Sequence, residues 1–223
     1  MSYPAIIEIE QPDRMANWRP LVHWIFVIPH WIVLHAVLNV VASITAIVAW
    51  VTVLATGKLP PRIAAFHASY IRYRARTFSY LWCVTDKFPP FDFKGSVEDP
   101  GGAGISVSIS PNLGDRNRLM ILFRFIVPFA WLTLLGMMGV SFPLWVWILQ
   151  LGLGAILIPG AVFSGAAWAL SAIAAVLGYV AIVFTGRWPE GLFRLAAGWV
   201  RVDARLWTYS MLLVDDYPPY SLN

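Results

Sequence analysis

The sequence predicts an all-α integral membrane protein made of two tandem repeats. Each repeat has a short strand, a transmembrane hairpin and an interfacial amphipathic helix, and the two strands form a small β-ribbon outside the membrane. Three observations lead to this fold class. Of the 223 residues, 59% are hydrophobic and 13% are charged, whereas about 25% of residues are charged in an average soluble domain. Two long runs, 20–57 and 125–186, contain no Lys, Arg, Asp or Glu. A long stretch of sequence also occurs twice at a fixed offset.

The repeated stretch divides the chain into two units. Residues 56–90 align with residues 185–219 without a gap, and both copies begin with Thr-Gly and end with Pro-Pro. A fixed offset over such a length is the signature of an internal repeat. We therefore expect a first unit at 1–95, a linker at 96–104 and a second unit at 105–223.

Each unit opens with a short stretch in which apolar and polar residues alternate. These stretches are 5–10 and 105–109, for example Ile105-Ser106-Val107-Ser108-Ile109. A period of two predicts a strand with one buried face. Because a single strand is not stable alone, we expect the two strands to pair with each other or with the tails that follow the Pro-Pro motifs.

The membrane segments are predicted at 20–57 and 119–186. A spanning helix needs about 20 apolar residues, so each run can hold more than one crossing. Every Lys and Arg lies outside the charge-free parts of these runs, and the positive-inside rule then favours an even number of crossings with all soluble segments in the cytoplasm. For the first run we expect a hairpin broken near Pro29 or near Asn39. One long, tilted, proline-kinked helix is the alternative.

The second run is longer than the first between its early proline, Pro128, and its Thr-Gly exit. This insertion predicts one additional hairpin, with breaks near Ser141–Pro143 and near Pro159-Gly160. The last helix of the run carries small residues at Ala167, Ser171, Ala174 and Gly178, a pattern that favours close packing of helices in membranes.

Amphipathic helices are predicted at 61–86 and 189–215. Polar residues fall on one face of each, and aromatic and aliphatic residues fall on the other. Arginine is too costly to place at the bilayer centre, so we expect these helices to lie flat, with arginines among the lipid headgroups, or to pack on the membrane bundle. The candidate headgroup or structural arginines are Arg62, Arg72, Arg76, Arg194, Arg201 and Arg205. For the two retained pairs, bidentate bonds to carboxylates or to carbonyl groups at helix ends are the favoured role.

The sequence Asp-x-aromatic-Pro-Pro-aromatic ends each amphipathic helix, because proline cannot continue a helix. Asp86 and Asp215 occupy its first position. We interpret both as turn or salt-bridge residues. Catalysis by the adjacent carboxylates Asp215 and Asp216 is disfavoured, since the first unit has Asp86-Lys87 in the same place.

Three histidines lie in the first membrane run, at His23, His30 and His35. An ionisable residue inside a membrane is a candidate functional site, and His23 and His30 are spaced to share a helix face. Ligation of haem or a metal ion is therefore conceivable. Hydrogen-bonded or interfacial histidines are the favoured interpretation, and no metal site is predicted.

The order of motifs resembles a domain-of-unknown-function family of bacterial integral membrane proteins. The resemblance rests on the PDR turn at Pro12–Arg14, the IPH sequence at Ile28–His30, the TGK/TGR exits, the paired arginines and the Pro-Pro endings. The second unit has Val127-Pro128-Phe129 where the first has IPH. The resemblance implies a membrane domain carried singly or in tandem, and it implies no activity.

The sequence contains no recognised catalytic or nucleotide-binding motif, so we expect no enzyme activity and no cofactor. We expect a membrane-anchoring, membrane-shaping or accessory scaffold protein of the bacterial inner membrane. Its partners would be membrane lipids, anionic ones foremost, together with a larger complex or a second copy. The net charge of +4 is assigned to headgroups rather than nucleic acid. The alternatives are a small permease or lipid-handling protein with a cavity between the repeats, and a haem-bearing redox subunit.

Overall fold

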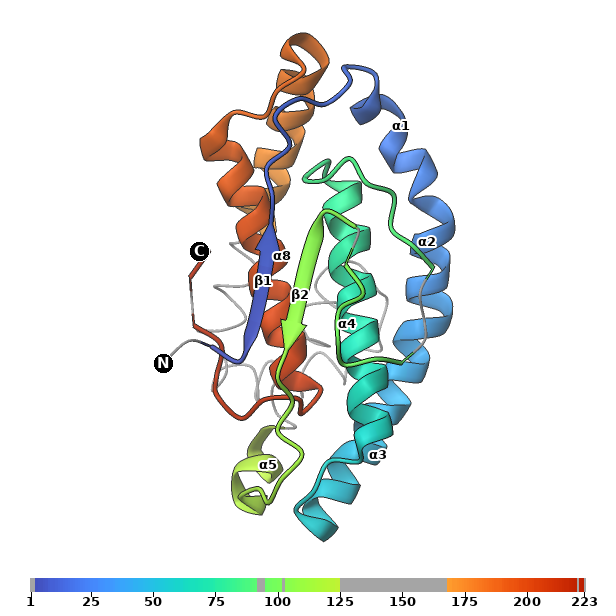
Figure 1. Ribbon diagram of the computed structural model, residues 1–223, viewed down its shortest axis with the longest axis vertical. Helices are drawn as coiled ribbons and strands as arrows, with labels where there is room; N and C mark the ends of the chain where they lie inside the picture. The colour runs from blue at the N-terminus through green and yellow to red at the C-terminus, as the bar shows by residue number, and fades with distance from the viewer. Residues whose placement is uncertain (1–2, 92–94, 102, 125–167, 220, 223) are drawn as a thin grey trace, which may run out of the picture.

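The structure is a computed structural model that describes residues 3–91, 95–101, 103–124, 168–219 and 221–222. It is mainly helical, with one two-stranded sheet (Figure 1). The β-ribbon lies across two long helices that run side by side, and a third, longer helix borders them on one side.

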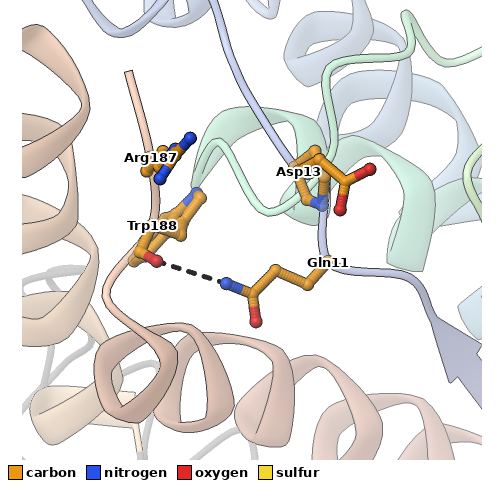
Figure 2. Close-up of a pocket in the computed structure, with 5 residues that line it drawn as sticks. Gln11, Asp13, Arg187 and Trp188 are labelled. Atoms are coloured by element: carbon orange, nitrogen blue, oxygen red, sulfur yellow. Dashed lines mark hydrogen bonds between the residues drawn. The ribbon is translucent and has the colours of Figure 1, made fainter. Parts of the chain in front are cut away.

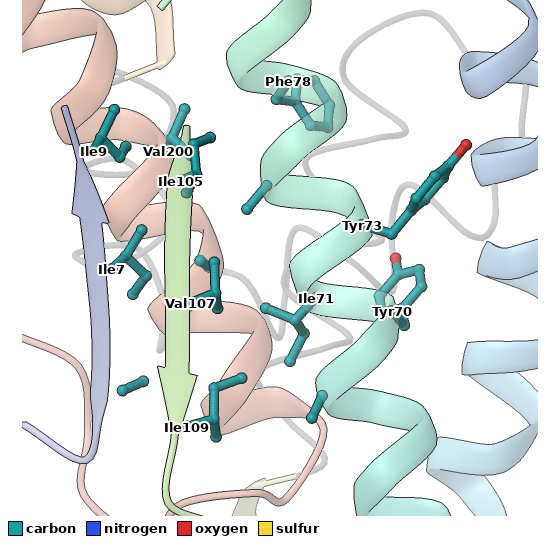
Figure 3. Close-up of a cluster of buried hydrophobic side chains, with 14 of the residues drawn as sticks. Ile7, Ile9, Tyr70, Ile71, Tyr73, Phe78, Ile105, Val107, Ile109 and Val200 are labelled. Carbon is teal, nitrogen blue, oxygen red and sulfur yellow. The ribbon is translucent and has the colours of Figure 1, made fainter. Parts of the chain in front are cut away.

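The two predicted strands pair with each other. Strand β1 (Ala5–Ile9) is antiparallel to β2 (Ile105–Ile109), and Ile7 faces Val107 at the centre of the register. In both strands the first, third and fifth residues are buried, as their alternating sequence predicts. Figure 3 shows these isoleucines and valines directed towards the helices behind the ribbon. The ribbon therefore covers the helical core with one apolar face.

Two 21-residue helices form the centre of the fold. Helix α4 (Pro61–Leu81) and helix α8 (Glu190–Ser210) begin and end 129 residues apart, the offset of the sequence repeat. A proline in extended conformation precedes each helix, Pro60 and Pro189. The helices are antiparallel to each other (Figure 1). Both end earlier than expected, because the chain already turns at Trp82 and at Met211.

Helix α4 differs from the predicted flat amphipathic helix. Residues 67–80 are all buried, so the arginines of this stretch lie inside the protein rather than on an exposed polar face. The covering elements are the ribbon, α8 and the long helix. Helix α8 keeps an exposed edge near its start, at Glu190, Gly191 and Arg194.

The hairpin predicted for the first run is wrong. The chain remains helical from Arg19 to Thr56. The segments are α1 (Arg19–Phe26), α2 (Ile28–Ile32), the π-helix η1 (Val33–Leu38) and α3 (Asn39–Thr56). Both expected break points coincide with irregularities in this helix: Pro29 begins a new helical segment, and Asn39 follows the π-helical turn. Neither reverses the chain, because proline is tolerated in the first turn of a helix and a π-helical turn shifts hydrogen bonding without ending it.

The second run is described only in part. Helix α5 (Arg118–Arg124) starts it and the helix Trp168–Thr185 ends it. The additional hairpin, with its expected breaks near Pro143 and Pro159, lies outside the described residues.

Each unit of the chain closes the exit turn of the other. The glycines of the two Thr-Gly exits, Gly57 and Gly186, have φ of 77° and 68°, the left-handed conformation that ends many helices. The Gly186 carbonyl accepts a hydrogen bond from the backbone N–H of Met15 at 2.8 Å, and the Gly57 carbonyl accepts one from Arg116 at 3.0 Å. The polar turn before each membrane run therefore binds the end of the other run.

Candidate functional site: an apolar helix face and a buried ionic centre

The helix from Arg19 to Thr56 touches the rest of the protein along one narrow stripe. Its buried residues are three, four or, once, seven positions apart, the spacings of one helix face. They are Pro20, His23, Val27, His30, Leu34, Leu38, Ala42, Ala49 and Val53.

The other faces of this helix are exposed and apolar. Fourteen large hydrophobic side chains between Leu21 and Val51 lie outside the protein core. They are Leu21, Trp24, Ile25, Phe26, Ile28, Trp31, Ile32, Val37, Val40, Val41, Ile44, Ile47, Val48 and Val51. We call this set the apolar face. A patch of this extent on a protein marks a contact with another protein or with a membrane.

The helix Trp168–Thr185 has the same two-sided character. Leu177, Val180 and Phe184 are exposed, Phe184 by 80%. On the opposite side Ser171 donates a hydrogen bond to the Leu195 carbonyl at 2.8 Å, and Gly178 leaves room for the ring of Trp188. The predicted small-residue stripe thus packs this helix closely on α8; its first member, Ala167, lies outside the described residues. Both helices are long and apolar enough to cross a membrane.

A buried ion pair joins the two central helices. Arg74 of α4 donates two hydrogen bonds to the Asp203 carboxylate of α8, from Nε at 2.8 Å and from Nη2 at 3.1 Å. Both residues are buried. Burial alone would lower the pKa of Arg74, but attraction to Asp203 outweighs it and raises that pKa. Arg74 is therefore held in its charged form.

Arg74 and Asp203 occupy equivalent positions of the two units, because they are 129 residues apart. Aromatic residues enclose the pair: the Arg74 guanidinium lies 4.7 Å from the ring centre of Phe78 and 4.8 Å from that of Trp207. The contacts Phe78–Trp199 and Tyr70–Trp207 lie on its two sides. Tyr70 is equivalent to Trp199 and Phe78 to Trp207 in the repeat, so the two contacts are related by symmetry. An approximate two-fold axis therefore passes through the ion pair.

A second carboxylate holds the arginine pair of the first unit. Asp99 lies 2.6 Å from Arg76 Nη2 and 3.7 Å from Arg72 Nε, and all three side chains are buried. Arg72 also donates to the carbonyls of Ser96 and Val97 at 3.2 and 2.9 Å. The segment that sequence analysis treated as a linker therefore supplies the partners of both arginines.

The equivalent pair of the second unit binds backbone carbonyls. Arg201 donates to Ile7 and to Leu222, each at 3.3 Å, and Arg205 donates to Ser221 at 3.4 Å. Burial lowers the pKa of both arginines. These contacts tie α8 to β1 and to the C-terminal tail.

Asp86 and Asp215 form ion pairs, but with other arginines than those of the amphipathic helices. Asp86 lies 3.7 Å from Arg19 Nη1, and Asp215 lies 3.6 Å from Arg116 Nε. Arg116 is buried and also donates to the carbonyl of Leu212 at 2.6 Å. Each pair fixes a Pro-Pro ending to the start of the membrane run of its own unit.

Arg62 lies in the first turn of α4 and Arg194 in the second turn of α8, and both are exposed. They are the two candidate arginines that remain available to lipid headgroups. The other four candidates lie against protein groups.

The structure does not bring the three candidate histidines together. His23 Nδ1 lies 2.9 Å from the Tyr80 carbonyl oxygen and 3.1 Å from Cys83 Sγ. His30 Nδ1 lies 2.7 Å from the Tyr73 hydroxyl. His35 is exposed and its Nδ1 lies 3.0 Å from the Trp31 carbonyl oxygen of its own helix. Among the described residues, no group of three or more His, Cys, Asp or Glu side chains is arranged to hold a metal ion.

Sequence analysis missed the fourth histidine, His67. It is fully buried in α4, with Nδ1 3.1 Å from the Met211 carbonyl oxygen and Nε2 3.0 Å from the Thr45 hydroxyl. The residue therefore connects the long helix, α4 and the turn after α8. The sequence feature that could have identified His67 is that a polar residue stands there among small and aromatic residues of the helix.

Lowering the pH should destabilise the protein through His67. Burial lowers its pKa from 6.5 to about 4, so the folded state holds the ring neutral while the unfolded state binds a proton below pH 6.5. This stability is complete above pH 6.5 and is lost as the pH falls towards 4, by about 3 kcal/mol in all. Thermal unfolding in detergent at pH 7.5 and 4.5 measures it. His67→Gln should show a smaller loss between these pH values, and an unchanged loss would contradict the assignment.

The sequence model of one family, described as a domain of unknown function (DUF4389), matches the chain twice, at residues 17–92 and 154–221. No curated protein matches the chain, and no solved structure matches it. The two matches cover more than half of the chain, which therefore belongs to the DUF4389 family of domains of unknown function.

Proposed function

We propose that the protein is a non-enzymatic anchor and scaffold of the bacterial inner membrane, with the apolar face and the helix Trp168–Thr185 embedded in lipid. The observation that carries this proposal is the single buried stripe of the long helix. A helix that lies on a membrane surface has a polar side towards water. Here the exposed sides carry mainly large apolar side chains and no Lys, Arg, Asp or Glu for 38 residues, so an apolar surrounding has to cover them.

Transfer of the apolar face from water into lipid is strongly favourable. Covering a large apolar side chain stabilises by about 1.5–3 kcal/mol when it passes from full exposure to full burial. Fourteen half-exposed side chains on the apolar face then represent on the order of 10 kcal/mol or more in favour of a lipid environment. This is comparable to the entire free energy of folding of a typical domain, about 5–15 kcal/mol.

We propose a multi-pass arrangement with the soluble segments in the cytoplasm. The basic residues outside the charge-free runs favour that side, and the pairing of β1 with β2 requires both strands to lie on one side of the membrane. At 1.5 Å per residue the long helix measures about 57 Å, against about 30 Å for the hydrocarbon core. One crossing would also put Arg19 and Gly57 on opposite sides of the membrane. We therefore propose that this helix is embedded with its axis close to the membrane plane and with both ends at the cytoplasmic surface. Arg62 and Arg194 are the proposed contacts with anionic headgroups.

The permease alternative requires a cavity between the units. The α4–α8 interface is instead occupied by the ion pair Arg74–Asp203 and by the contact of Phe78 with Trp199, whose ring centres are 5.0 Å apart. A scaffold role, in which the two units form one rigid body, fits this packing better.

The proposal is tested by washing isolated membranes at high pH, which removes peripheral proteins. We expect the full chain to remain in the membrane pellet. The variant Val40→Asp/Ile44→Asp/Ile47→Asp should be retained in a smaller fraction, because each aspartate costs about 3 kcal/mol in the bilayer centre while the helix Trp168–Thr185 still holds the chain in lipid. Ile6→Asp is the matched control, since Ile6 is exposed on the ribbon. Release of the unmodified chain would exclude the anchor role.

The scaffold part has its own test. Purification from native membranes in mild detergent should retain a second membrane protein in a fixed ratio, and the triple aspartate variant should lose it. A chain that purifies alone from native membranes, at every detergent concentration that keeps it folded, would refute the scaffold role.

A further inference from the structure

A pocket of about 480 Å³ lies just beyond the end of the helix Trp168–Thr185. It is lined by Gln11, Pro12, Asp13, Arg187 and Trp188. Figure 2 shows Asp13 and Arg187 on different sides of this pocket, with the hydrogen bond from Gln11 to the Trp188 backbone below them. The pocket thus offers one positive and one negative side chain around a single space.

Hydrogen bonds from side chains to backbone carbonyls hold the walls of the pocket in place. Gln11 Nε2 donates to the Trp188 carbonyl at 3.2 Å. Asn17 Nδ2 donates to the Val183 carbonyl at 2.8 Å, in the last turn of the helix. Trp188 is itself fixed by a 2.7 Å hydrogen bond from its Nε1 to the Cys83 carbonyl. Asp13 and Arg187 therefore extend from backbone segments that these hydrogen bonds hold in place.

The repeat places residues equivalent to Asp13 and Arg187 at the other end of the molecule. Lys58 occupies the position of Arg187 in the aligned Thr-Gly exits, and Asp115 occupies the position of Asp13 in the PDR and GDR turns. At that end of the molecule Lys58 Nζ lies 3.9 Å from Asp115 Oδ1, an exposed ion pair. Within the described residues, Asp13 and Arg187 form no ion pair with each other. The same two charges are thus paired at one end and held apart around a pocket at the other.

We propose that this pocket binds the phosphoethanolamine headgroup of a membrane lipid. Arg187 suits the phosphate, because guanidinium groups form strong charge-assisted hydrogen bonds with phosphate oxygens. Asp13 and the Gln11 side-chain carbonyl suit the ammonium group, which offers three donors. A zwitterion satisfies both charges at once, whereas an anionic headgroup would place negative charge beside Asp13.

The position of the pocket fits a lipid rather than a free phosphodiester. This step rests on the proposed function, in which the helix Trp168–Thr185 lies in the membrane. The exposed side chains of Leu177, Val180 and Phe184 extend along that helix from the pocket end. Acyl chains can lie along them while the headgroup occupies the pocket.

The test is native mass spectrometry of the detergent-solubilised full chain with short-chain phosphatidylethanolamine, phosphatidylglycerol and phosphatidylcholine. We expect the ethanolamine lipid to bind most tightly. Asp13→Asn should weaken it about fivefold while leaving the glycerol lipid unchanged or tighter, and Arg187→Gln should weaken both about fivefold. Equal binding of the three lipids, or an Asp13→Asn variant that keeps the ethanolamine preference, would overturn the proposal.

Two controls make the result specific. Lys58→Gln and Asp115→Asn change the equivalent ion pair and should leave lipid binding unchanged; an equal loss in these variants would contradict the site. Glycerophosphoethanolamine, the headgroup without acyl chains, should bind far more weakly than the lipid, and equal binding would show that the pocket recognises a free phosphodiester. A chain that stays in alkali-washed membranes but shows no lipid preference refutes the pocket alone, whereas release from the membranes refutes the anchor role.

Discussion

Asp203→Ala should lower the free energy of unfolding by about 3–5 kcal/mol, the cost of leaving one member of a buried ion pair without its partner. Arg74 would keep its charge, because a guanidinium does not lose its proton at accessible pH. It would then lie between Phe78 and Trp207 without a carboxylate. Chemical denaturation in detergent, followed by tryptophan fluorescence, measures the change.

The double variant Arg74→Met/Asp203→Leu separates the loss of the pair from the loss of one charge. Replacing both members with apolar residues of similar size is often neutral or stabilising, so we expect the double variant to be more stable than Asp203→Ala. If the double variant is as unstable as the single one, the two charges do not stabilise each other and the proposed cost of an unpaired Arg74 is wrong.

Asp99→Ala is expected to have an effect of similar or greater size, because one carboxylate serves two buried arginines. It also accepts hydrogen bonds from the backbone N–H groups of Gly101 and Val107, at 2.8 and 2.7 Å. Its removal leaves Arg72 and Arg76 with two positive charges close together, at a cost of about 3–5 kcal/mol. The same denaturation experiment measures it.

The neighbouring Glu98 gives the matched control. Its side chain is exposed, and Glu98→Ala should change the free energy of unfolding by less than about 0.5 kcal/mol. Hydrogen exchange adds a second measurement, since Asp99→Ala should specifically speed the exchange of the Val107 amide in β2. Equal effects of the two substitutions would refute the anchoring role of Asp99.

The short-range features of the fold could be predicted from the sequence. Alternation gave both strands within one residue, 5–10 against Ala5–Ile9 and 105–109 against Ile105–Ile109. The prolines after the Thr-Gly exits marked the starts of α4 and α8. The prediction of a hairpin was wrong because a local feature such as Pro29 indicates only an irregularity in a helix. Whether the chain reverses there depends on how the whole helix packs against its neighbours.

The candidate site was less predictable. Helical spacing identified Arg72 and Arg76 as neighbours on one face, but spacing says nothing of what covers that face, and the covering residue, Asp99, lies in a segment without a repeat. The central pair escaped notice for a different reason. Alignment of the two units highlights positions at which the residues are identical. Arg74 and Asp203 occupy one aligned position with opposite charges, and it is this difference that allows them to form an ion pair.

That difference has a consequence for how the chain can assemble. Equivalent positions meet at the approximate two-fold axis, so a pair of first units would bring two guanidinium groups together, and a pair of second units would bring two carboxylates together. Like charges in a buried contact are strongly unfavourable. A first unit is therefore complementary only to a second unit. Because one polypeptide contains both, the two units are always present in equal number.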